Sequence, residues 1–365
     1  MAKYLISEGV DVTLFEKRSV GEASSHAAGL IVPHSIRRTN TWGYLAEALN
    51  FARKGVLRIR EVDRRWWLSL ITEFGQDAPP EAWDFVRKAG DFALQEYRKM
   101  AEAHNDFEFS EDGVLEIYES KKRFSRAVES TEREKQLKVE SLDVAGYAGG
   151  IFYPNCARVC TESFTRRIAD EIGRVRVVYD KVTFAGLDGT VGIGNDAQKF
   201  DAVIAALGVD CRKLGIPVTA IKGYGQRLEN TQSLNSLPHR AIELPEYGNA
   251  IVAFENWVKV TGGLEFDFSP SGENALAELE PGLRVLGATN TIPMATVAGF
   301  RPCSPDGFPI VGRKENLVVA TGAGRLGWSF APALGRLAAD LALGRSRDFP
   351  HLSRYARKIR SGTLV

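Results

Sequence analysis

Two apolar runs that each end in glycine constrain the fold of this chain more than any other feature. They occupy residues 201–208 and 317–322, and neither alternates between apolar and polar positions. Unbroken apolar runs of this length are typical of strands that are buried on both faces of a parallel sheet. We therefore predict a parallel sheet that the chain enters twice, with Gly208 and Gly322 at the ends of its strands.

The beginning of the chain carries the pattern helix, glycine, strand, acid. Residues 2–8 have amphipathic helical spacing, Gly9 suits the left-handed residue that ends a helix, and a β-rich run precedes Glu16. In a dinucleotide-binding βαβ unit this acid binds ribose hydroxyls, and a glycine-rich phosphate turn lies about 20 residues earlier. Counting back from Glu16 puts that turn before Met1. The same pattern is common in α/β proteins, so by itself it also fits a unit without a nucleotide.

A segment of small residues follows at 23–31, with Ser24, Ser25 and Gly29 among them. Small side chains let a backbone approach a cofactor closely, and the two hydroxyls can donate hydrogen bonds. Taken alone, this segment also fits a polar loop.

Arg301 lies in the segment 299–312, shortly before a glycine-dense stretch at 316–328. An arginine can hold a carboxylate in two parallel charge-assisted hydrogen bonds and stays charged. Arg301 beside a glycine-rich strand-to-helix turn therefore suits a carboxylate substrate near a bound cofactor. The structural alternative is that Arg301 caps a nearby carbonyl or pairs with Asp306.

Composition excludes some classes of function. A chain of 365 residues exceeds one usual hydrophobic core, which predicts two domains, and a net charge of +1 gives no reason to propose nucleic acid as a partner. The four cysteines have neither zinc-site spacing nor the density of a disulfide framework, so a reduced cytoplasmic compartment fits best. No apolar run approaches the roughly 20 residues of a membrane helix. Peripheral membrane contact stays open.

Several elements are expected outside the parallel sheet. Residues 42–75 have a long helical pattern, in which Trp66 and Trp67 are expected to be packing anchors instead of ligand contacts. Helices are also predicted at 81–103 and 120–140, and a β-hairpin around Asp112-Gly113. Alternating strands at 223–228, 250–254 and 258–265 predict an antiparallel sheet in a second domain.

With these motifs in family order, the chain resembles the D-amino-acid-oxidase-like superfamily of FAD-dependent oxidoreductases, nearest to the D-amino-acid dehydrogenase branch. The resemblance rests on residues 12–17, 23–31, 222–224 and 261–265 and on the two C-terminal motifs. It implies an α/β (α+β) fold with a Rossmann-like, parallel-sheet FAD-binding domain built from discontinuous segments, and a substrate domain with a mainly antiparallel sheet. The expected segments are 1–80, 150–217 and 295–365 for FAD, and 81–149 and 218–294 for substrate.

The resemblance also implies roles for individual residues. Arg301 would bind the substrate carboxylate, and Tyr153 and Tyr224 are weaker candidates for the substrate side. The residues expected to bind FAD are Glu16, Lys17, Ser24, Ser25, Ala28, Gly29, Leu30, Gly208, Gly322, Gly324, Leu326, Gly327 and Trp328. No metal is expected.

The chain departs from the family pattern at three places. Ala323 replaces a histidine common in that turn, and Cys303 does not align with the cysteine that tethers flavin in sarcosine oxidases, so non-covalent FAD is expected. The glycine-rich turn is missing before Glu16. We expect either a start codon assigned too far downstream or a fragment; weakened FAD binding is the third alternative.

In the resembling enzymes an amino acid is oxidatively deaminated as a hydride passes from its α-carbon to flavin N5. We expect an amino-acid or imino-acid substrate, electron transfer to a quinone, partner protein or other non-oxygen acceptor, and a cytoplasmic protein that can touch the membrane peripherally. Two alternatives remain: a glycine/sarcosine-type oxidase that uses oxygen, and a non-catalytic subunit or fragment derived from a flavoprotein. Motifs in the chain do not specify substrate chirality.

Overall fold

The computed structural model describes residues 1–33, 36–133, 139–173, 175–229, 240–288, 295–345 and 349–364. In it the chain enters the predicted parallel sheet twice. Strand β12 (Val203–Ala205) pairs in parallel with β19 (Leu317–Thr321), and Ile204 lies opposite Val318. Strand β18 (Ile310–Lys314) flanks β19 in the antiparallel direction. The whole of β19 is buried, as its unbroken apolar sequence predicts.

The beginning of the chain also has the predicted order of elements. Helix α1 (Ala2–Ser7) is followed by Gly9, which has a φ of +76°, and then by β1 (Thr13–Glu16). Strand β1 pairs in parallel with β8 (Arg176–Tyr179), as a βαβ unit requires. The short helix α2 (Glu22–Ser25) comes next.

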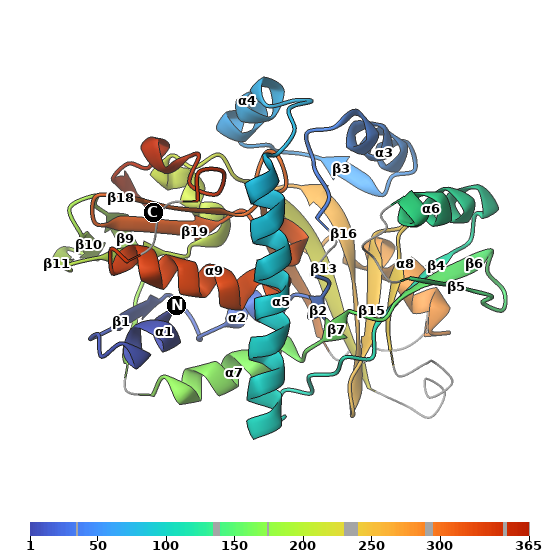
Figure 1. Cartoon of the computed structure of the whole chain (residues 1–365), viewed down its shortest axis with the longest axis horizontal. Coiled ribbons are helices and arrows are strands. Elements are labelled where there is room, and N and C mark those ends of the chain that lie inside the picture. Colours follow the sequence, from blue (N-terminus) through green and yellow to red (C-terminus); the bar gives the residue numbers. More distant parts are fainter. Residues whose placement is uncertain are drawn as a thin grey trace.

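The largest sheet has nine strands and is mostly antiparallel, with the order β17-β13-β16-β15-β14-β4-β6-β5 and with β3 beside β16. Its strands are β3 (Leu57–Ile59), β4 (Val114–Tyr118), β5 (Glu140–Leu142), β6 (Gly149–Tyr153), β13 (Thr219–Glu229), β14 (Ala241–Leu244), β15 (Asn249–Ala253), β16 (Trp257–Phe266) and β17 (Ala295–Cys303). One face packs on α8 (Ala275–Val285) through residues such as Leu115 and Leu279. The other face shares a core with α5 (Pro80–Ala103) and α9 (Gly327–Ala342). Figure 1 shows α9 extending from α5 away from this sheet, beside β18 and β19.

Smaller elements complete the described chain. They are β2 (Leu30–Ile31), α3 (Trp42–Arg53), α4 (Arg64–Thr72), α6 (Lys121–Arg133), β7 (Ala157–Arg158), α7 (Thr161–Glu171), β9 (Val182–Ala185), β10 (Thr190–Ile193), β11 (Asp196–Lys199), β20 (Gly362–Thr363) and the 3-10 helices Gly208–Leu214, Gly324–Leu326 and Ala356–Lys358.

The single helix predicted over residues 42–75 is wrong, because this segment forms α3, β3 and α4. Gly55 has a φ of +73°, which ends α3, and β3 then pairs with the edge of β16. Asp63 begins a new helix by accepting hydrogen bonds from the first backbone N–H groups of α4. Helix α5 agrees with the prediction for 81–103, and α6 with the first part of the prediction for 120–140, whose residues 134–138 lie outside the described chain.

The β-hairpin predicted around Asp112-Gly113 is also wrong. Gly113 does turn the chain, with a φ of +78°, but the two arms separate. The first arm bridges to β7, because Phe107 and Phe109 bury their rings against α5. The second arm is β4, which lies between β14 and β6. Alternation alone does not choose a strand's partner.

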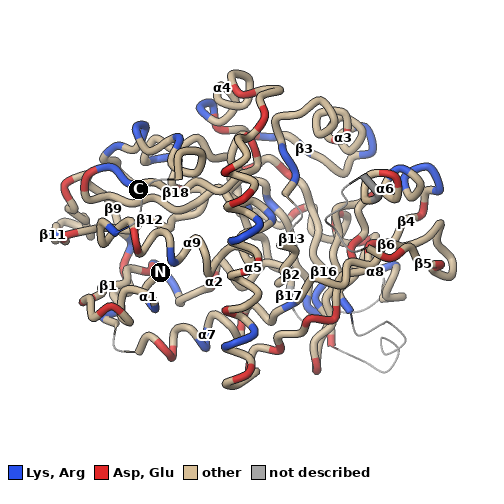
Figure 2. Tube along the Cα trace, viewed as in Figure 1, with Lys and Arg blue, Asp and Glu red and all other residues tan. Residues whose placement is uncertain are grey.

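We propose that the nine-stranded sheet and α8 are the core of the substrate domain. Strands β3, β6 and β17 join this sheet, although the segments containing them were expected mainly in the FAD domain. In the described chain, no helix combines the length and apolarity needed to cross a bilayer. Acidic and basic residues are interspersed along the trace, consistent with the net charge of +1 (Figure 2).

Candidate active site

The small-residue segment after α2 is fixed against the large sheet by a buried lysine. Lys259 of β16 is 3% exposed, and its Nζ donates to the backbone oxygens of Ser25 and Ala27 at 2.7 and 3.1 Å. Thr161 also donates to the Ser25 oxygen, at 2.8 Å. Burial lowers the pKa of Lys259, although Glu162 opposes that shift. These bonds hold Ser24, Ser25 and Ala28 at the face of the sheet.

Gly29 then lets the chain enter β2. It has a φ of +82°, and a Cβ there would lie 2.1 Å from the Val159 oxygen, so another side chain cannot fit without displacing backbone. After Leu30, the Val32 N–H donates to Ser329 Oγ at 2.9 Å. The predicted residues 24–30 therefore lie beside the first turn of α9.

Gly208 and Gly322, which follow the parallel strands β12 and β19, lie close to each other near the first turn of α9. Thr321, the last residue of β19, donates from Oγ1 to the Gly208 oxygen at 2.8 Å, and Gly322 follows with a φ of +78°. A Cβ on Gly208 or Gly327 would have no heavy atom within 4 Å, apart from chain neighbours and its own helix, so both backbones border open space. Trp328 donates from Nε1 to the Ser24 oxygen at 3.3 Å, which joins this turn to the small-residue segment.

Glu16 and Lys17 lie at the carboxyl end of β1, just before α2. Glu16 is half-buried, and its Oε1 accepts a hydrogen bond from the Arg18 N–H at 3.2 Å, while Lys17 is exposed. In the described residues no hydrogen bond or ion pair joins them to the turn after β19. Their place at the end of a parallel strand is the one expected for a ribose-binding acid.

The side chain of Arg301 lies across the large sheet over two glycines, Gly223 and Gly263, which we call the glycine floor. Its guanidinium extends from β17 over Gly223 of β13, and Nη1 donates to the Gly263 oxygen of β16 at 2.8 Å. A Cβ at Gly223 would lie 2.5 Å from both terminal nitrogens, so the guanidinium lies flat only over glycine.

The charge of Arg301 has no carboxylate partner in the described chain. Asp306, the alternative partner, binds His351 and Arg354, so pairing of Arg301 with Asp306 is wrong, whereas capping of a carbonyl occurs at Gly263. Burial lowers the pKa of Arg301, and the nearby positive charge of Arg325 acts in the same direction. An unpaired, partly buried guanidinium of this kind favours an anionic ligand.

A cluster of polar side chains around the buried Glu116 lies on the same face of the sheet. Glu116 of β4 lies directly opposite Glu243 of β14, and Glu116 Oε2 accepts hydrogen bonds from Tyr118 at 2.5 Å and from Tyr153 at 3.2 Å. Burial raises the pKa of Glu116, and the charge of Glu243 raises it further. Arg325 pairs with Glu243 at 2.9 Å. We call these five residues the Glu116 cluster.

Sequence reasoning missed most of the Glu116 cluster. Only Tyr153 was a candidate, and Arg325 lay inside the glycine-rich turn without an assigned role. The feature of the sequence that could have indicated this cluster is Glu116, a single carboxylate within the otherwise uncharged strand Val114–Tyr118, which is buried at every position. The positive charge of Arg325 lowers the pKa of both Glu116 and Arg301.

The structure does not bring Tyr224 to this site. Its side chain belongs to the core on the α8 side of the sheet, and its hydroxyl donates to Glu265 Oε2 at 3.1 Å. The neighbouring Lys222 is fully buried there and pairs with Asp267 at 2.6 Å. Side chains alternate between faces along a strand, so Tyr224 points away while Gly223 faces Arg301.

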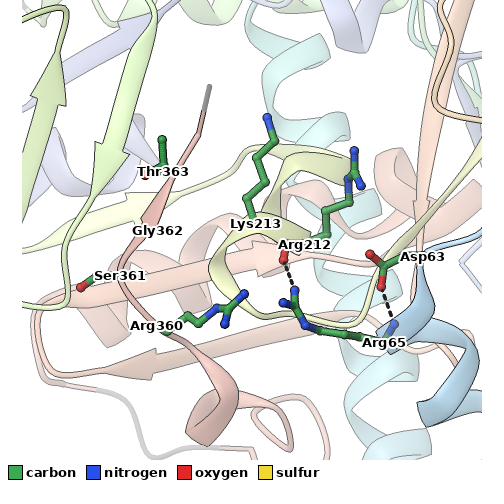
Figure 3. Close-up of a pocket in the computed structure, with 8 residues that line it drawn as sticks. All are labelled: Asp63, Arg65, Arg212, Lys213, Arg360, Ser361, Gly362 and Thr363. Atoms are coloured by element: carbon green, nitrogen blue, oxygen red, sulfur yellow. Dashed lines mark hydrogen bonds between the residues drawn. The ribbon is translucent and has the colours of Figure 1, made fainter.

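An open pocket of about 390 Å³ lies elsewhere, at the first turn of α4 (Figure 3). It contains none of the residues predicted for FAD or substrate. Its lining residues are Asp63, Arg65, Arg212, Lys213, Arg360, Ser361, Gly362 and Thr363. The candidate active site is defined by Arg301, the Glu116 cluster and the glycine turns, and this pocket is separate from it.

Comparison with known proteins found a family and individual relatives that the chain is similar to. A model of the family described as "FAD dependent oxidoreductase" matches residues 1–341. The chain is 36% identical over 348 residues to a D-proline dehydrogenase of Pyrobaculum islandicum, covering 94% of this chain and 92% of that protein. It is 29% identical over 272 residues to a D-amino acid dehydrogenase of Xanthobacter autotrophicus, covering 65% and 64%.

Among solved structures, a glycine oxidase from Geobacillus kaustophilus superposes with a TM-score of 0.72 at 17% identity. The match covers 96% of this chain and 94% of that one. At this level of identity the likeness concerns the fold alone.

Proposed function

The chain belongs to the FAD dependent oxidoreductase family, and from this premise we propose that it is a dehydrogenase for a D-amino acid or a cyclic D-imino acid. As a member of this family it is an FAD-dependent enzyme that acts on carbon–nitrogen bonds of amino acids. D-Proline is the first substrate to test, because the relative that is 36% identical is a D-proline dehydrogenase.

The observation that carries the proposal is the unpaired guanidinium of Arg301. It lies on a glycine floor, on the sheet face to which Lys259 fixes the small-residue segment, and it has no acidic partner in the described chain. A substrate carboxylate would supply the missing negative charge through two parallel hydrogen bonds. The Gly263 oxygen already occupies one N–H of Arg301, which restrains the direction in which the others point.

The residues present fit an FAD. Gly208 and Gly327 border open space, so their backbones can approach a flat ring system. The N-terminus of α9, sixteen residues long, offers positive potential to an oxygen or phosphate of the cofactor. We propose that residues 24–30, Gly208 and residues 322–328 hold the flavin part, and that Glu16 binds the ribose.

In this arrangement the chain binds and orients the substrate. FAD, when bound, supplies the redox chemistry by accepting a hydride from the substrate. Arg301 fixes the carboxylate, and the angle of its guanidinium is set by Gly223 and Gly263. Glu116 lies directly opposite Glu243 on the same face of the sheet, and we propose that this pair of carboxyl groups faces the substrate's amino group.

We propose a quinone or another non-oxygen compound as the electron acceptor, since the two relatives named above are dehydrogenases. A glycine/sarcosine-type oxidase is the alternative. Reoxidation separates the two: a reduced dehydrogenase recovers its yellow colour quickly with a soluble quinone and slowly with air, whereas an oxidase recovers quickly with air.

The direct test is anaerobic mixing of the FAD-loaded protein with D-proline, L-proline and a panel of D- and L-amino acids. We expect the long-wavelength flavin absorbance to bleach with D-proline or another D-amino acid, and much more slowly with the L-enantiomer. Absence of bleaching with every compound would overturn the proposed reaction. Bleaching by L-amino acids alone would overturn the assigned chirality.

A further inference from the structure

Exposed apolar side chains are concentrated in one short part of this protein. Of the twelve large apolar side chains that are well exposed in the described residues, seven lie between residues 42 and 71. Single exposed apolar residues are normal, but a contiguous group marks an interaction surface. The three elements that carry this group are α3, β3 and α4.

The outer side of α3 is apolar along most of its length. Trp42, Leu45 and Leu49 are 74, 39 and 51% exposed, and their spacing puts them on one side of the helix. The opposite side carries the buried Phe51 and the half-buried Tyr44. Helix α3 is therefore apolar both toward the protein and toward the outside.

Helix α4 and strand β3 extend this apolar surface. Trp67, Leu68 and Ile71 of α4 are 52, 54 and 56% exposed, and Ile59 of β3 is 66% exposed. The expectation that Trp67 is a packing anchor is therefore wrong. The ring of Trp42 lies 4.8 Å from that of Phe74, so the start of α3 adjoins the chain just after α4. Figure 1 shows α3, β3 and α4 together at the top of the molecule. We call the outer faces of these three elements the α3–α4 surface.

Cations without acidic partners border the α3–α4 surface. Arg53 and Lys54 end α3, and Arg64 and Arg65 begin α4; within the described chain none of the four forms an ion pair with a carboxylate. The basic start of α6 adjoins α3, where the Arg123 guanidinium lies 5.4 Å from the Phe51 ring. Figure 2 shows basic stretches around α3, β3 and α4 with acidic ones among them. Glu61, which follows β3, is an exposed acid.

The cationic border continues into the pocket at the first turn of α4. Arg65 lines that pocket together with Arg212, Lys213 and Arg360, and Figure 3 shows Arg65 and Arg360 extending toward each other while Arg212 and Lys213 point away from them. Lys213 pairs with Asp210, whereas the three arginines have no carboxylate partner in the described residues. Unpaired guanidinium groups at an open pocket suit a phosphate group.

We propose that the α3–α4 surface docks onto an anionic lipid bilayer. The apolar side chains of α3, β3 and α4 would enter the headgroup boundary, and the bordering cations would contact lipid phosphates, as in other interfacial helices. Complementary charge favours a lipid surface over a second copy of this chain, because two copies would bring the same cations together. The docking proposal does not depend on the reaction catalysed.

Docking also bears on the electron acceptor, and this part rests on the proposed function. The chain just before α3 contacts the segment that follows Arg301, because Thr39 Oγ1 donates a hydrogen bond to the Pro305 oxygen at 2.6 Å. Helix α3 therefore begins beside the region of the candidate active site. A docked α3 would bring that region to the lipid, where quinones dissolve.

Flotation with vesicles tests the docking. The FAD-loaded protein is expected to float with phosphatidylglycerol vesicles and to remain below with phosphatidylcholine vesicles. The double variants W67S/L68S and W42S/L49S are expected to lower vesicle binding at least about tenfold. The matched controls Leu276→Ser and Tyr179→Ser, which remove apolar side chains that are 64 and 66% exposed elsewhere, are expected to bind like the parent protein.

Two outcomes would overturn the proposal. One is failure of the parent protein to float with anionic vesicles. If light scattering then shows that the double variants dissociate a dimer, the α3–α4 surface joins two copies of the chain instead. The other is an equal loss of binding in variants and controls. Anaerobic bleaching by amino acids, measured without lipid, keeps the two proposals apart: a protein that floats but is not bleached retains the docking and loses the reaction.

Discussion

Arg301 is positioned by residues that lack side chains, and its role can be tested through its charge. Arg301→Leu is expected to raise KM for D-proline roughly a hundredfold, because two charge-assisted hydrogen bonds to the carboxylate are lost. Pyrrolidine, which has no carboxylate, is expected to be turned over equally by variant and parent. The measurement is steady-state kinetics with a soluble artificial acceptor.

Arg313→Leu is the matched control for Arg301→Leu. Arg313 also donates to backbone carbonyls, at 2.7 Å to the Leu341 oxygen, but it lies at the far end of α9 from the candidate active site. A hundredfold rise in KM for this control, or an unchanged KM for Arg301→Leu, would contradict the assignment.

Gly223 gives a finer test of the same site. A Cβ there would lie 2.5 Å from the terminal nitrogens of Arg301, whereas a Cβ at Gly225 meets nothing nearer than 3.4 Å. Gly223→Ala is therefore expected to push the guanidinium aside and raise KM about tenfold, while the free energy of unfolding changes little, because the flexible arginine gives way. Gly225→Ala is the control. Equal KM values for the two variants would show that Gly223 does not determine the position of the Arg301 guanidinium.

At the scale of elements, the packing of α8 on the large sheet contains a titrating acid. Glu278 of α8 is 6% exposed and lies 3.2 Å from Arg58; burial raises its pKa to about 7, Arg58 opposes the shift, and Glu265 adds to it. The folded protein therefore binds more protons than the unfolded chain between pH 4.5 and about 7. The contribution of Glu278 to the free energy of unfolding is fully present below pH 4.5 and is lost as the pH rises through about 7.

Glu278→Gln is expected to remove this pH dependence, which amounts to about 1–3 kcal/mol. Urea unfolding at pH 5 and pH 8 measures it: the variant should gain stability relative to the parent protein at the higher pH. Glu280→Gln, on the exposed side of the same helix, is the control. Parallel pH profiles for parent and Glu278→Gln proteins would refute the expected titration.

Elements with local signals could be predicted, and elements defined by distant partners could not. Gly9 and the apolar run at 317–322 carry their structure in their own residues, so α1, β19 and the pairing of β19 with β12 follow from the sequence. The break between α3 and α4 depends on β16 accepting Leu57 as a neighbour. The sequence near residue 57 does not indicate that β16 is its neighbour.

The candidate site divides in the same way. Arg301 and the glycine turns could be predicted because each belongs to a compact motif. The Glu116 cluster could not, because it depends on the register between β4 and β14, in which Glu116 meets Glu243. Alternation along β13 puts Tyr224 and Gly223 on opposite faces of the sheet. Which of the two faces bears the site depends on the packing of α8, and that packing is not encoded near these residues.

For the whole molecule, the cofactor is expected to join parts that are far apart in sequence. The residues proposed to hold FAD come from the start, middle and end of the chain, so FAD should stabilise the folded protein as a unit. Saturation at about 100 times Kd corresponds to roughly 2.7 kcal/mol, or about 3–4 °C in Tm for a chain of this size. Differential scanning of the protein with and without FAD measures this shift.

Acid precipitation tests how the cofactor is attached. Non-covalent FAD should remain in the supernatant and fluoresce there, whereas a pellet that stays yellow would contradict the expected non-covalent binding. A Tm that does not respond to added FAD in stripped protein would contradict the proposed cofactor site.

Helix α3 is apolar toward both the protein and the outside, and this has a kinetic consequence if the protein docks as proposed. An enzyme held on lipid meets its acceptor by diffusion in two dimensions, so its rate follows the mole fraction of quinone in the bilayer. Adding quinone-free vesicles would then slow turnover by dilution of the surface, although nothing has been removed from the assay. The same addition would leave turnover with a water-soluble acceptor unchanged.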